Sequence, residues 1–405
     1  MKLFVPKEKS PETRVALSPD TVKRLSGLGF DVTFEKGAGE LSRITDEALT
    51  AAGAKVATAK DAGTADVVLK VNRPTAAEAK GYRKGALVLA AMDPHGHESD
   101  IKALAAAGIS TFAMEFMPRI TRAQSMDILS SQANLAGYQA VIEGAAVFDR
   151  ALPMMMTAAG TVPAARVFVM GAGVAGLQAI ATARRLGAVV TATDVRAAAG
   201  EQVESLGAKF IMTDALKDAS GEGGYARELT ADEQKAQAEL VASHIAKQDI
   251  VITTALIPGR PAPKLVTKAM LANMAPGSVV VDLAVERGGN VEGSKPGEIA
   301  RVGHVSVVGY ENMAGRLAAT ASQLYAKNLV AFLETMVDGE SKKLNVNPED
   351  ELVAATLLTH GGKVVHPLFA KEPAAKPAAK ASAKPAAKAP ARKKPAATAS
   401  KGAKS

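Results

Sequence analysis

The feature that most restricts the fold is a glycine-rich turn between a short apolar strand and a helix. The strand, RVFVM at residues 166–170, is followed by Gly171, Gly173 and Gly176 and then by LQAIATARRL. In such a turn the first glycine allows a tight bend, the second lets a pyrophosphate approach the backbone, and the third lets the helix pack on the strand. The helix N-terminus then offers N–H groups and a positive dipole to an anion. The motif therefore predicts a dinucleotide-binding βαβ unit rather than a turn without a ligand.

The second half of this fingerprint is an acidic residue 18 positions past Gly176. The next apolar run, AVVTATDVR, ends in Asp194, and a carboxylate about 20 residues after the glycines binds ribose hydroxyls. The same carboxylate would repel a 2′-phosphate, which favours NAD(H) over NADP(H). Arg196 is able to accommodate such a phosphate, but we expect the carboxylate at the strand end to outweigh it.

Short apolar runs alternate with helical patterns along most of the chain. The predicted strands are residues 2–6, 31–34, 67–71, 86–91, 166–170, 189–193, 209–212, 250–253, 279–281 and 305–308. The predicted helices include residues 21–28, 46–52, 98–107, 125–149 and 317–337. This alternation predicts an α/β fold of two Rossmann-like, doubly wound parallel-sheet domains with a cleft between them.

The order of these elements also predicts the domain boundaries. The helix at 317–337 is long enough to return the chain to its first domain. We therefore expect a discontinuous N-terminal α/β domain, 1–130 plus 318–370, and an NAD(H)-binding Rossmann domain, 131–317. The remaining residues, 371–405, form a tail of Ala, Lys and Pro.

The basic character of the chain resides in this tail. Residues 371–405 hold nine Lys and one Arg against one Glu, so the net charge of the tail is +9. The net charge of the whole chain is +8, which leaves residues 1–370 at −1. Five prolines interrupt any helix there, and nothing in the composition can form a core, so we expect disorder. We expect a solvated appendage, and docking to an acidic partner or an anionic lipid is the alternative.

Composition excludes several other classes of function. The chain has no Cys, which rules out disulfides, thiolate zinc sites and iron–sulfur clusters, and no Trp, which argues against base-stacking nucleic-acid platforms. No apolar run is long enough for a membrane-spanning helix, and the N-terminus lacks a signal-peptide pattern, so we expect a cytoplasmic protein. HExxH, GxSxG, P-loop and EF-hand patterns do not occur in the sequence.

A dense polar segment lies between the two predicted domains. It contains Arg119, Arg122, Gln124, Ser125, Asp127, Ser130, Ser131, Gln132 and Asn134. Polar residues at an interdomain hinge are where a dinucleotide enzyme would hold its nicotinamide end. The same residues equally fit a helix N-terminus, with Ser125 or Thr121 as the cap and Asp127 in the first turn.

The histidines and one methionine run give two separate predictions. Among the six histidines (His95, His97, His244, His304, His360 and His366), only His95 and His97 are close neighbours. They could belong to a metal or catalytic site, but without a third ligand we expect a solvated loop. The three methionines at 154–156 are expected to pack in the core near a hinge, because Met fills irregular gaps.

Several long runs are distinctive enough to indicate a family. They are PRITRAQSMDILSSQANLAGYQAV, RALPMMMTAAGTVPAARVFVMGAGVAGLQAIATARRLGAVVTATDVR, DIVITTALIPGRPAP, GSVVVDLAVERGGN and LAATASQLYAKNL. Together they resemble the NAD(H)-binding component of proton-translocating transhydrogenase, and the similarity extends from residue 1 to about residue 340. The run VPKEKSPETRVALSP also resembles the wider family shared with alanine dehydrogenase.

The resemblance implies roles for particular residues, and we expect no metal site. It implies that the nicotinamide ring and its ribose are held by Arg119, Gln124, Asp127 and Ser130. It implies that the rest of the nucleotide is bound by Gly171, Gly173, Val174, Ala175, Gly176, Asp194, Val195, Arg196, Gly224, Tyr225, Thr254, Ala255 and Leu256. The segment 221–225 looks like a mobile loop that closes over the nucleotide with Tyr225 at its tip, and its glycines suit such a lid.

The resemblance also implies a reaction and partners. This component would bind NADH and present it for hydride transfer, of the AB-specific type, to NADP⁺ on a separate NADP(H)-binding beta subunit. Homodimers are expected, and proton translocation would belong to the membrane subunits. In some members this component continues into transmembrane helices, whereas this chain ends in the tail, so we expect a free-standing subunit beside a small membrane alpha subunit. It would be peripheral to the inner membrane through these partners, and no nucleic acid is expected.

Departures from alanine dehydrogenase separate the two relatives. That enzyme should carry a Lys, a His and an Asp around its substrate; Lys70 matches the Lys, no His falls in ALVLAAMDPHGH where it is expected, and Glu286 replaces the Asp. Without that His the chain lacks a base to transfer a proton, which suits a protein with no organic substrate of its own. A soluble alanine dehydrogenase-like enzyme is the alternative, and an NAD(H)-sensing module tethered by its tail is a third hypothesis.

Overall fold

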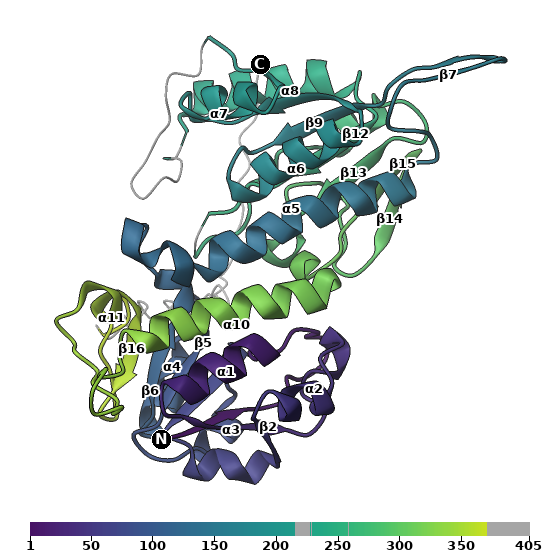
Figure 1. Ribbon diagram of the computed structural model, residues 1–405. Helices are drawn as coiled ribbons and strands as arrows, with labels where there is room; N and C mark the ends of the chain where they lie inside the picture. The colour runs from purple at the N-terminus through teal and green to yellow at the C-terminus, as the bar shows by residue number, and fades with distance from the viewer. Residues whose placement is uncertain (215–226, 228, 258, 371–405) are drawn as a thin grey trace, which may run out of the picture. The chain divides into compact units, whose positions relative to one another are not determined.

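The structure is a computed structural model that describes residues 1–214, 227, 229–257 and 259–370 (Figure 1). The predicted disordered tail and the predicted lid residues Gly224 and Tyr225 lie outside the described residues. Residues 1–370 form one compact unit. It is built around two large β-sheets and a small hairpin.

The first sheet has the strand order β17-β16-β6-β5-β4-β1-β2-β3. Its strands are β1 (Lys2–Val5), β2 (Asp31–Glu35), β3 (Lys55–Ala57), β4 (Val67–Asn72), β5 (Leu87–Ala91), β6 (Ser110–Ala113), β16 (Leu357–His360) and β17 (Lys363–Val364). Strands β1 to β6 pair in parallel, whereas β16 pairs antiparallel with both β6 and β17. The C-terminal strands therefore extend the sheet that the N-terminal strands begin.

The second sheet has the order β11-β10-β9-β12-β13-β15-β14. Its strands are β9 (Arg166–Met170), β10 (Val189–Thr193), β11 (Lys209–Phe210), β12 (Ile250–Thr253), β13 (Val279–Asp282), β14 (Ile299–Val302) and β15 (Val305–Val308). All pair in parallel except β14, which is antiparallel to β15. Because β10 and β12 lie on opposite sides of β9, the order reverses at β9/β12, which is where doubly wound sheets bind ligands.

Helices connect the strands of both sheets. The α-helices are α1 (Pro19–Gly27), α2 (Asp46–Ala51), α3 (Ala76–Lys80), α4 (Glu98–Ala106), α5 (Ile128–Val147), α6 (Val174–Arg185), α7 (Ala199–Ser205), α8 (Ala231–Ile245), α9 (Lys268–Ala272), α10 (Ala318–Glu334) and α11 (Glu351–Thr356). The short 3₁₀ helices are η1 (Glu40–Ser42), η2 (Ala59–Thr64), η3 (Met114–Phe116), η4 (Thr121–Met126), η6 (Val285–Arg287) and η7 (Met313–Leu317). Among the helices so described, none combines the length and hydropathy needed to span a bilayer.

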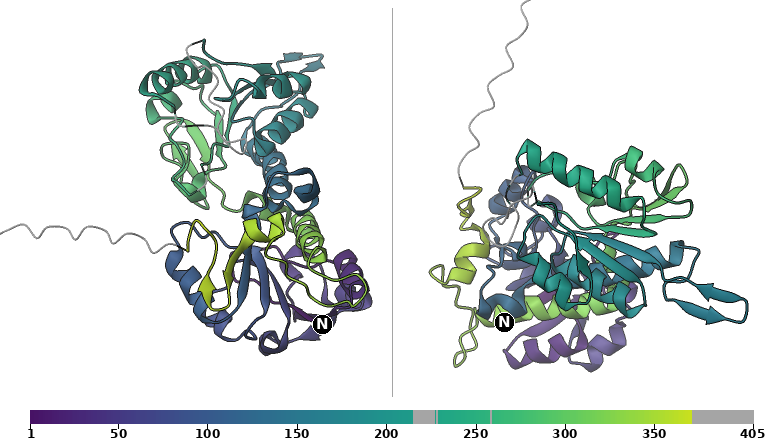
Figure 2. Two further views of the ribbon diagram at one scale, coloured as in Figure 1. Left: turned by 90° about the vertical axis from the view of Figure 1, so that its left-hand side faces the viewer. Right: turned by 90° about the horizontal axis from the view of Figure 1, so that it is seen from above.

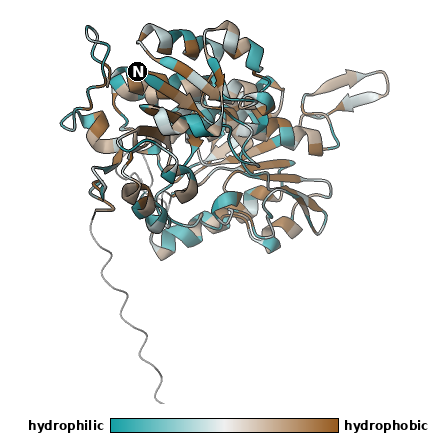
Figure 3. Cartoon of the chain, turned by 90° about the horizontal axis from the view of Figure 1, so that it is seen from below, coloured by the Kyte–Doolittle hydropathy of each residue, from teal (hydrophilic) through white to brown (hydrophobic). Residues whose placement is uncertain are grey.

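Both faces of each sheet are buried, because successive side chains point to opposite faces and apolar residues occupy both. In β9, Val167 and Val169 belong to one apolar cluster and Phe168 and Met170 to another on the opposite face. Figure 3 shows the hydrophobic strands between helices that carry hydrophilic residues. The predicted α/β class with doubly wound parallel sheets is confirmed, and the antiparallel edge strands are an addition to it.

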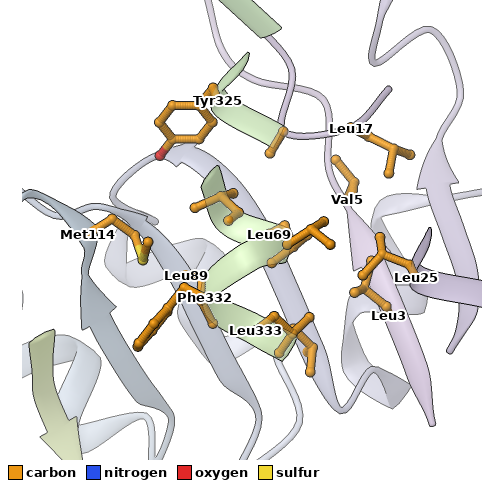
Figure 4. Close-up of a cluster of buried hydrophobic side chains, with 14 of the residues drawn as sticks. Leu3, Val5, Leu17, Leu25, Leu69, Leu89, Met114, Tyr325, Phe332 and Leu333 are labelled. Carbon is orange, nitrogen blue, oxygen red and sulfur yellow. The ribbon is translucent and has the colours of Figure 1, made fainter. Parts of the chain in front are cut away.

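Helix α10 packs in the core of the first sheet. Its Phe332 and Leu333 share a buried cluster with Leu3 and Leu69 (Figure 4), and the Phe332 ring meets the Phe112 ring edge-on at 5.6 Å between centroids. Helix α5 contributes to both cores, because Ile128 lies in this cluster and its later turns pack under the second sheet. The domain boundaries themselves remain a prediction.

The prediction for residues 154–156 is wrong. Met154, Met155 and Met156 are 62 %, 42 % and 81 % exposed, and they lead into a hairpin of β7 (Met155–Thr157) and β8 (Gly160–Val162). Figure 2 shows this hairpin projecting away from the second sheet. The prediction failed because apolarity alone does not distinguish a core segment from an exposed one.

Candidate functional site

The glycine turn 171–176 joins β9 to α6 as the sequence predicts. Gly171 has φ +102°, and a Cβ there would lie 2.4 Å from Thr254 Oγ1. A Cβ on Gly176 would lie 1.8 Å from the carbonyl oxygen of Gly171, so the helix packs on the turn without room for any side chain. A Cβ on Gly173 would meet no atom within 4 Å. Two glycines thus close the turn, and the third leaves the backbone open to a ligand at the α6 N-terminus, where the first N–H groups have no intrahelical partner.

A fourth glycine, which the sequence analysis did not single out, brings α5 against this turn. A Cβ on Gly137 would lie 2.0 Å from the carbonyl oxygen of Ala175. Near the same crossing, the Asn134 side chain donates to Gln178 Oε1 at 3.3 Å. The only sequence signal for this contact was a glycine inside a predicted helix, which favours close backbone approach.

Asp194 lies at the end of β10 and is 7 % exposed. Its Oδ2 accepts the Ala172 N–H at 2.7 Å and Arg196 Nη2 at 2.8 Å, and its Oδ1 accepts the backbone N–H and Nε of Arg196 at 2.9 and 2.8 Å. Burial alone would raise the pKa of Asp194, but the bonds from Arg196 and Ala172 lower it. The side chain is therefore a carboxylate, and Arg196 binds it instead of extending toward a separate phosphate site. Val195, between them, is half-buried.

The third strand of the site, β12, ends at Thr253 and is followed by Thr254, Ala255 and Leu256. Thr254 Oγ1 donates toward the carbonyls of Met170 and Gly171, at 3.3 and 3.2 Å. Both backbone groups of Ala255 bond to the buried Asn290 side chain, at 3.1 Å to Oδ1 and 2.9 Å to Nδ2. Leu256 is 48 % exposed.

Asn290 is bonded in turn to Asp282, and the sequence analysis singled out neither residue. Asp282 is fully buried at the end of β13, and its oxygens accept the N–H groups of Asn290 at 3.1 Å and Val291 at 3.2 Å. The turn beyond β12 is thus fixed from β13, next to the glycine turn. Isolated Asn and Asp residues carry no local pattern that reveals such a contact.

The polar segment provides the cap of α5. Asp127 Oδ1 accepts the Ser130 N–H at 3.0 Å and Oδ2 accepts the Ser130 hydroxyl at 2.5 Å. The helix-cap alternative therefore holds for these two residues, with Asp127 as the N-cap rather than Ser125 or Thr121. Arg119 and Gln124 are exposed. Binding of a nicotinamide by these four residues remains a prediction.

The other polar side chains of this segment tie it to the rest of the chain. Arg122 forms ion pairs with Asp350 at 2.8 Å and Glu351 at 3.0 Å. Ser131 and the Ser125 carbonyl both bond to Asn328, and Gln132 accepts a bond from Arg14. The segment is therefore bonded both to the loop after β1, through Arg14, and to residues 318–370.

The histidine pair has ordinary partners. His97 lies 3.6 Å from Asp93 and 3.7 Å from Asp100, and the His95 ring packs against Phe116 and Phe369. Within the described residues there is no group of three or more His, Asp or Glu that could hold a metal ion. The pair is thus joined to neighbouring side chains of the first sheet's loops.

The side chains relevant to an organic-acid substrate are already paired. Lys70 is 2 % exposed, and its Nζ lies 3.3 Å from Glu8 and 3.6 Å from Glu78. Glu286 Oε1 accepts the backbone N–H of Asn312 at 2.5 Å. A lysine buried between two carboxylates is not poised to bind an incoming carboxylate or carbonyl.

Arg14 is paired in the same way with Glu12. Its Nε and Nη2 donate to the two Glu12 oxygens, each at 2.8 Å, and Glu12 also accepts bonds from Asn72 and Asn312. Burial alone would raise the pKa of Glu12, but the hydrogen bonds and charge of Arg14 lower it to about 2. This cluster joins the loop after β1 to the loop before α10.

Two surface hollows lie elsewhere, at the amino ends of the second sheet. One of about 640 Å³ is lined by Phe148, Arg150, Met155, Val162, Arg166 and Asp249, and one of about 540 Å³ by Ala145, Leu152, Pro153, Arg185, Leu186 and Gly187. Arg166 begins β9 and Asp249 precedes β12, so the first hollow is at the opposite edge from the glycine turn. It belongs to the base of the β7–β8 hairpin rather than to the predicted nucleotide site.

Known proteins match nearly the whole of residues 1–370. The family model for the N-terminal domain of alanine dehydrogenase/PNT matches residues 4–136, and the model for its C-terminal domain matches residues 140–367. An NAD(P) transhydrogenase alpha-subunit chain of Rhodospirillum rubrum is 56% identical over 377 residues, covering 91% of this chain and 98% of that protein. Alanine dehydrogenase of Halomonas elongata is 33% identical over 383 residues, covering 90% and 95%.

A solved structure agrees with these matches. The crystal structure of transhydrogenase from Sinorhizobium meliloti superposes with a TM-score of 0.81 at 64% identity, covering 91% of this chain and 100% of that one. Sequence identity is thus higher to these two transhydrogenase chains than to the alanine dehydrogenase.

The low pKa of Glu12 predicts a pH-dependent stability. A carboxyl that ionises at about 2 when folded, against an ordinary 4.5, stabilises the fold above pH 4.5 and loses that contribution as the pH falls toward 2. We expect Glu12→Gln to lower the unfolding free energy at pH 7 by on the order of 3 kcal/mol, and by much less at pH 3. Urea unfolding at both pH values measures this, with the exposed Glu349→Gln as control. An equal loss at pH 7 and pH 3 would contradict the assigned ion pair.

Proposed function

The chain belongs to the alanine dehydrogenase/PNT family, and we propose that it is the NAD(H)-binding component of a proton-translocating transhydrogenase. The observation that carries this proposal is the open glycine turn with Asp194 beside it, at the β9/β12 reversal of the sheet. Its occurrence in a chain that is 56% identical to a transhydrogenase alpha subunit supports the choice within the family.

In the proposed reaction a hydride moves from C4 of NADH on this chain to C4 of NADP⁺ on a beta subunit. The products are NAD⁺ and NADPH, of AB-type stereochemistry, and no proton accompanies the hydride. The step therefore requires the two rings at about 3–3.5 Å with water excluded, but neither an acid nor a base. Proton translocation belongs to the membrane partners, the beta subunit and a small alpha subunit, so this chain is peripheral to the membrane.

The described residues suit a division of roles along the nucleotide. Gly171, Gly173 and Gly176, with the first turn of α6, would hold the pyrophosphate. Asp194 would accept the adenosine ribose hydroxyls; because its oxygens already accept four bonds, the ribose must share them or replace those from Arg196. Thr254, Ala255, Leu256 and the neighbouring Val174, Ala175 and Val195 would line the same edge.

The nicotinamide end is assigned to Arg119, Gln124, Asp127 and Ser130. The Asp127–Ser130 cap holds its two side chains in one geometry, which is a fixed surface for orienting a ring. Gln124, exposed one turn earlier, supplies an amide donor and acceptor for a carboxamide.

The alternative, an alanine dehydrogenase-like enzyme, is less well supported. Lys70, which matches the substrate lysine of that enzyme, is paired with Glu8, and Glu286, which replaces its Asp, accepts the backbone N–H of Asn312. Oxidation of NADH by pyruvate and ammonia without a partner would identify that enzyme. An NAD(H)-sensing module, the third hypothesis, would bind NADH but transfer no hydride to NADP⁺ in the presence of the partner.

The proposed homodimer has a candidate contact in the β7–β8 hairpin. An isolated two-stranded hairpin is marginal in water, and this one carries three exposed methionines beside two hollows at its base. Two copies related by a twofold axis would each insert a hairpin beside the other's hollows, since a twofold contact uses the same patch twice. A second copy of this chain is therefore the expected occupant.

A charged hairpin should abolish this dimer. Met154→Asp combined with Met156→Asp places two carboxylates at the contact, where desolvating them is unfavourable. We expect light scattering to give a dimer for the unchanged chain and a folded monomer for the double variant. Leu368→Asp, at an exposed leucine of the C-terminal segment, should remain dimeric. A dimer that survives the hairpin change would move the contact elsewhere.

Gln124 should control hydride transfer more than nucleotide binding. Gln124→Asn keeps the amide but shortens its reach, so it should cost NADH affinity only about 1 kcal/mol. A ring displaced by about 1 Å loses on the order of 100-fold in rate. Stopped-flow transfer to a purified NADP(H)-binding partner, beside equilibrium NADH titration, measures both, with the exposed Gln234→Asn on α8 as control. Transfer at the unchanged rate would remove Gln124 from the reacting site.

A further inference from the structure

The side-chain amide of Asn328, on helix α10, forms hydrogen bonds on both sides of the bend between η4 and α5. Asn328 is 7 % exposed. Its Nδ2 donates to the Ser125 carbonyl at 2.8 Å, and its Oδ1 accepts the Ser131 hydroxyl at 2.7 Å. Ser125 lies in η4 and Ser131 in the first turn of α5, and Figure 1 shows α10 running beside α5.

The residue between these two contacts is Asp127, the N-cap of α5. The backbone there is extended, with φ −75° and ψ 99°, so the chain changes direction at this position. One planar amide, bonded on either side of the bend, fixes how η4 is oriented relative to α5. The bend therefore depends on a side chain about 200 residues further along the sequence.

Gln132 and Arg122 also link this segment to residues 318–370, each from one side of the bend only. Gln132 Nε2 donates to the Ala321 carbonyl at 3.2 Å from the α5 side. The ion pairs of Arg122 with Asp350 and Glu351 join side chains that are 45 %, 26 % and 61 % exposed, and exposed pairs contribute little. Breaking a buried hydrogen bond so that its partner is left unsatisfied costs more. Asn328 is thus the stronger determinant of the bend.

We propose that Asn328 is a positioning residue for hydride transfer, acting through Ser125 and Ser131 on the nicotinamide-holding residues on both sides of the bend. The proposal rests on the proposed function. Gln124 immediately precedes Ser125, and the Asp127–Ser130 cap immediately precedes Ser131. A shift of η4 against α5 would therefore separate Gln124 from the cap without touching the glycine turn that holds the pyrophosphate.

The most selective variant is Asn328→Asp, which keeps the shape and the acceptor for Ser131. It replaces the Nδ2 donor by an oxygen that faces the Ser125 carbonyl, so the link to η4 becomes repulsive. Ser131→Ala removes the other link from the α5 side and leaves Asn328 in place. Leu333→Ala, in the last turn of the same helix, is the control, because it costs packing in the first sheet's core without a bond to the bend.

Three measurements separate positioning from stability. They are amide hydrogen exchange of residues 119–134 in the full chain, NADH affinity by titration, and single-turnover hydride transfer to NADP⁺ on a purified NADP(H)-binding partner. We expect Asn328→Asp to accelerate exchange in 119–134 and to slow transfer by about 10- to 100-fold, with NADH affinity within about 3-fold. Ser131→Ala should change the same quantities in the same direction but less.

The control decides the interpretation. Leu333→Ala should lower the melting temperature while leaving the exchange of 119–134 and the transfer rate unchanged. Normal exchange and a normal rate in Asn328→Asp and Ser131→Ala would overturn the proposal, as would an equal loss of rate in Leu333→Ala. Should the unchanged chain bind NADH yet transfer no hydride to NADP⁺, the proposed function fails, and the exchange measurement still reports on the bend.

Discussion

Backbone packed on backbone is the constraint on which the site depends. Gly176 lies against the carbonyl of Gly171, and Gly137 lies against the carbonyl of Ala175, with no space for a Cβ at either glycine. The first contact presses α6 onto the end of β9, and the second presses α5 onto α6. Because α5 begins with the Asp127 cap, the polar segment is carried on a helix that the turn itself positions. The proposed pyrophosphate site and the proposed nicotinamide site therefore share one scaffold.

The ionic groups near this scaffold are arranged to satisfy one another. Glu12 holds Arg14, Glu8 holds Lys70, and Asp194 holds Arg196. The first two pairs are buried or nearly so, and a buried charge whose partner is removed is strongly destabilising. The Glu12–Arg14 pair favours the ionised Glu12 in the fold, whereas burial outweighs the attraction of Lys70 and raises the pKa of Glu8. Both pairs leave the proposed chemistry to positioning, which is what a hydride transfer without a proton requires. The Asp194–Arg196 pair differs from these two because it is partly exposed. A ribose hydroxyl can therefore replace one of the hydrogen bonds that the Arg196 guanidinium donates to Asp194.

Sequence reasoning succeeded where the signal is local and failed where it depends on a distant partner. The strand–glycine–helix order of β9 and α6, and Asp194 at the end of β10, follow from period and spacing alone. Strand β3 has three residues, none of them buried, and β16 pairs only with β6, far away in sequence, and with the short β17, so neither was predicted. The exposure of Met156 and the links made by Asn290 and Asn328 depend on tertiary contacts for which a single sequence carries no pattern. Arg196 was noticed, but only the structure shows that it binds Asp194.

We have proposed that the edge formed by the glycine turn and Asp194 binds NAD(H). Equilibrium titration of the purified chain with NADH and with NADPH, repeated on Asp194→Ala, tests it most directly. Because a 2′-phosphate would meet a carboxylate, we expect the unchanged chain to bind NADH much more tightly than NADPH. Asp194→Ala should weaken NADH binding and narrow the difference between the two affinities. Equal affinity of the unchanged chain for both nucleotides would contradict the assignment of this edge.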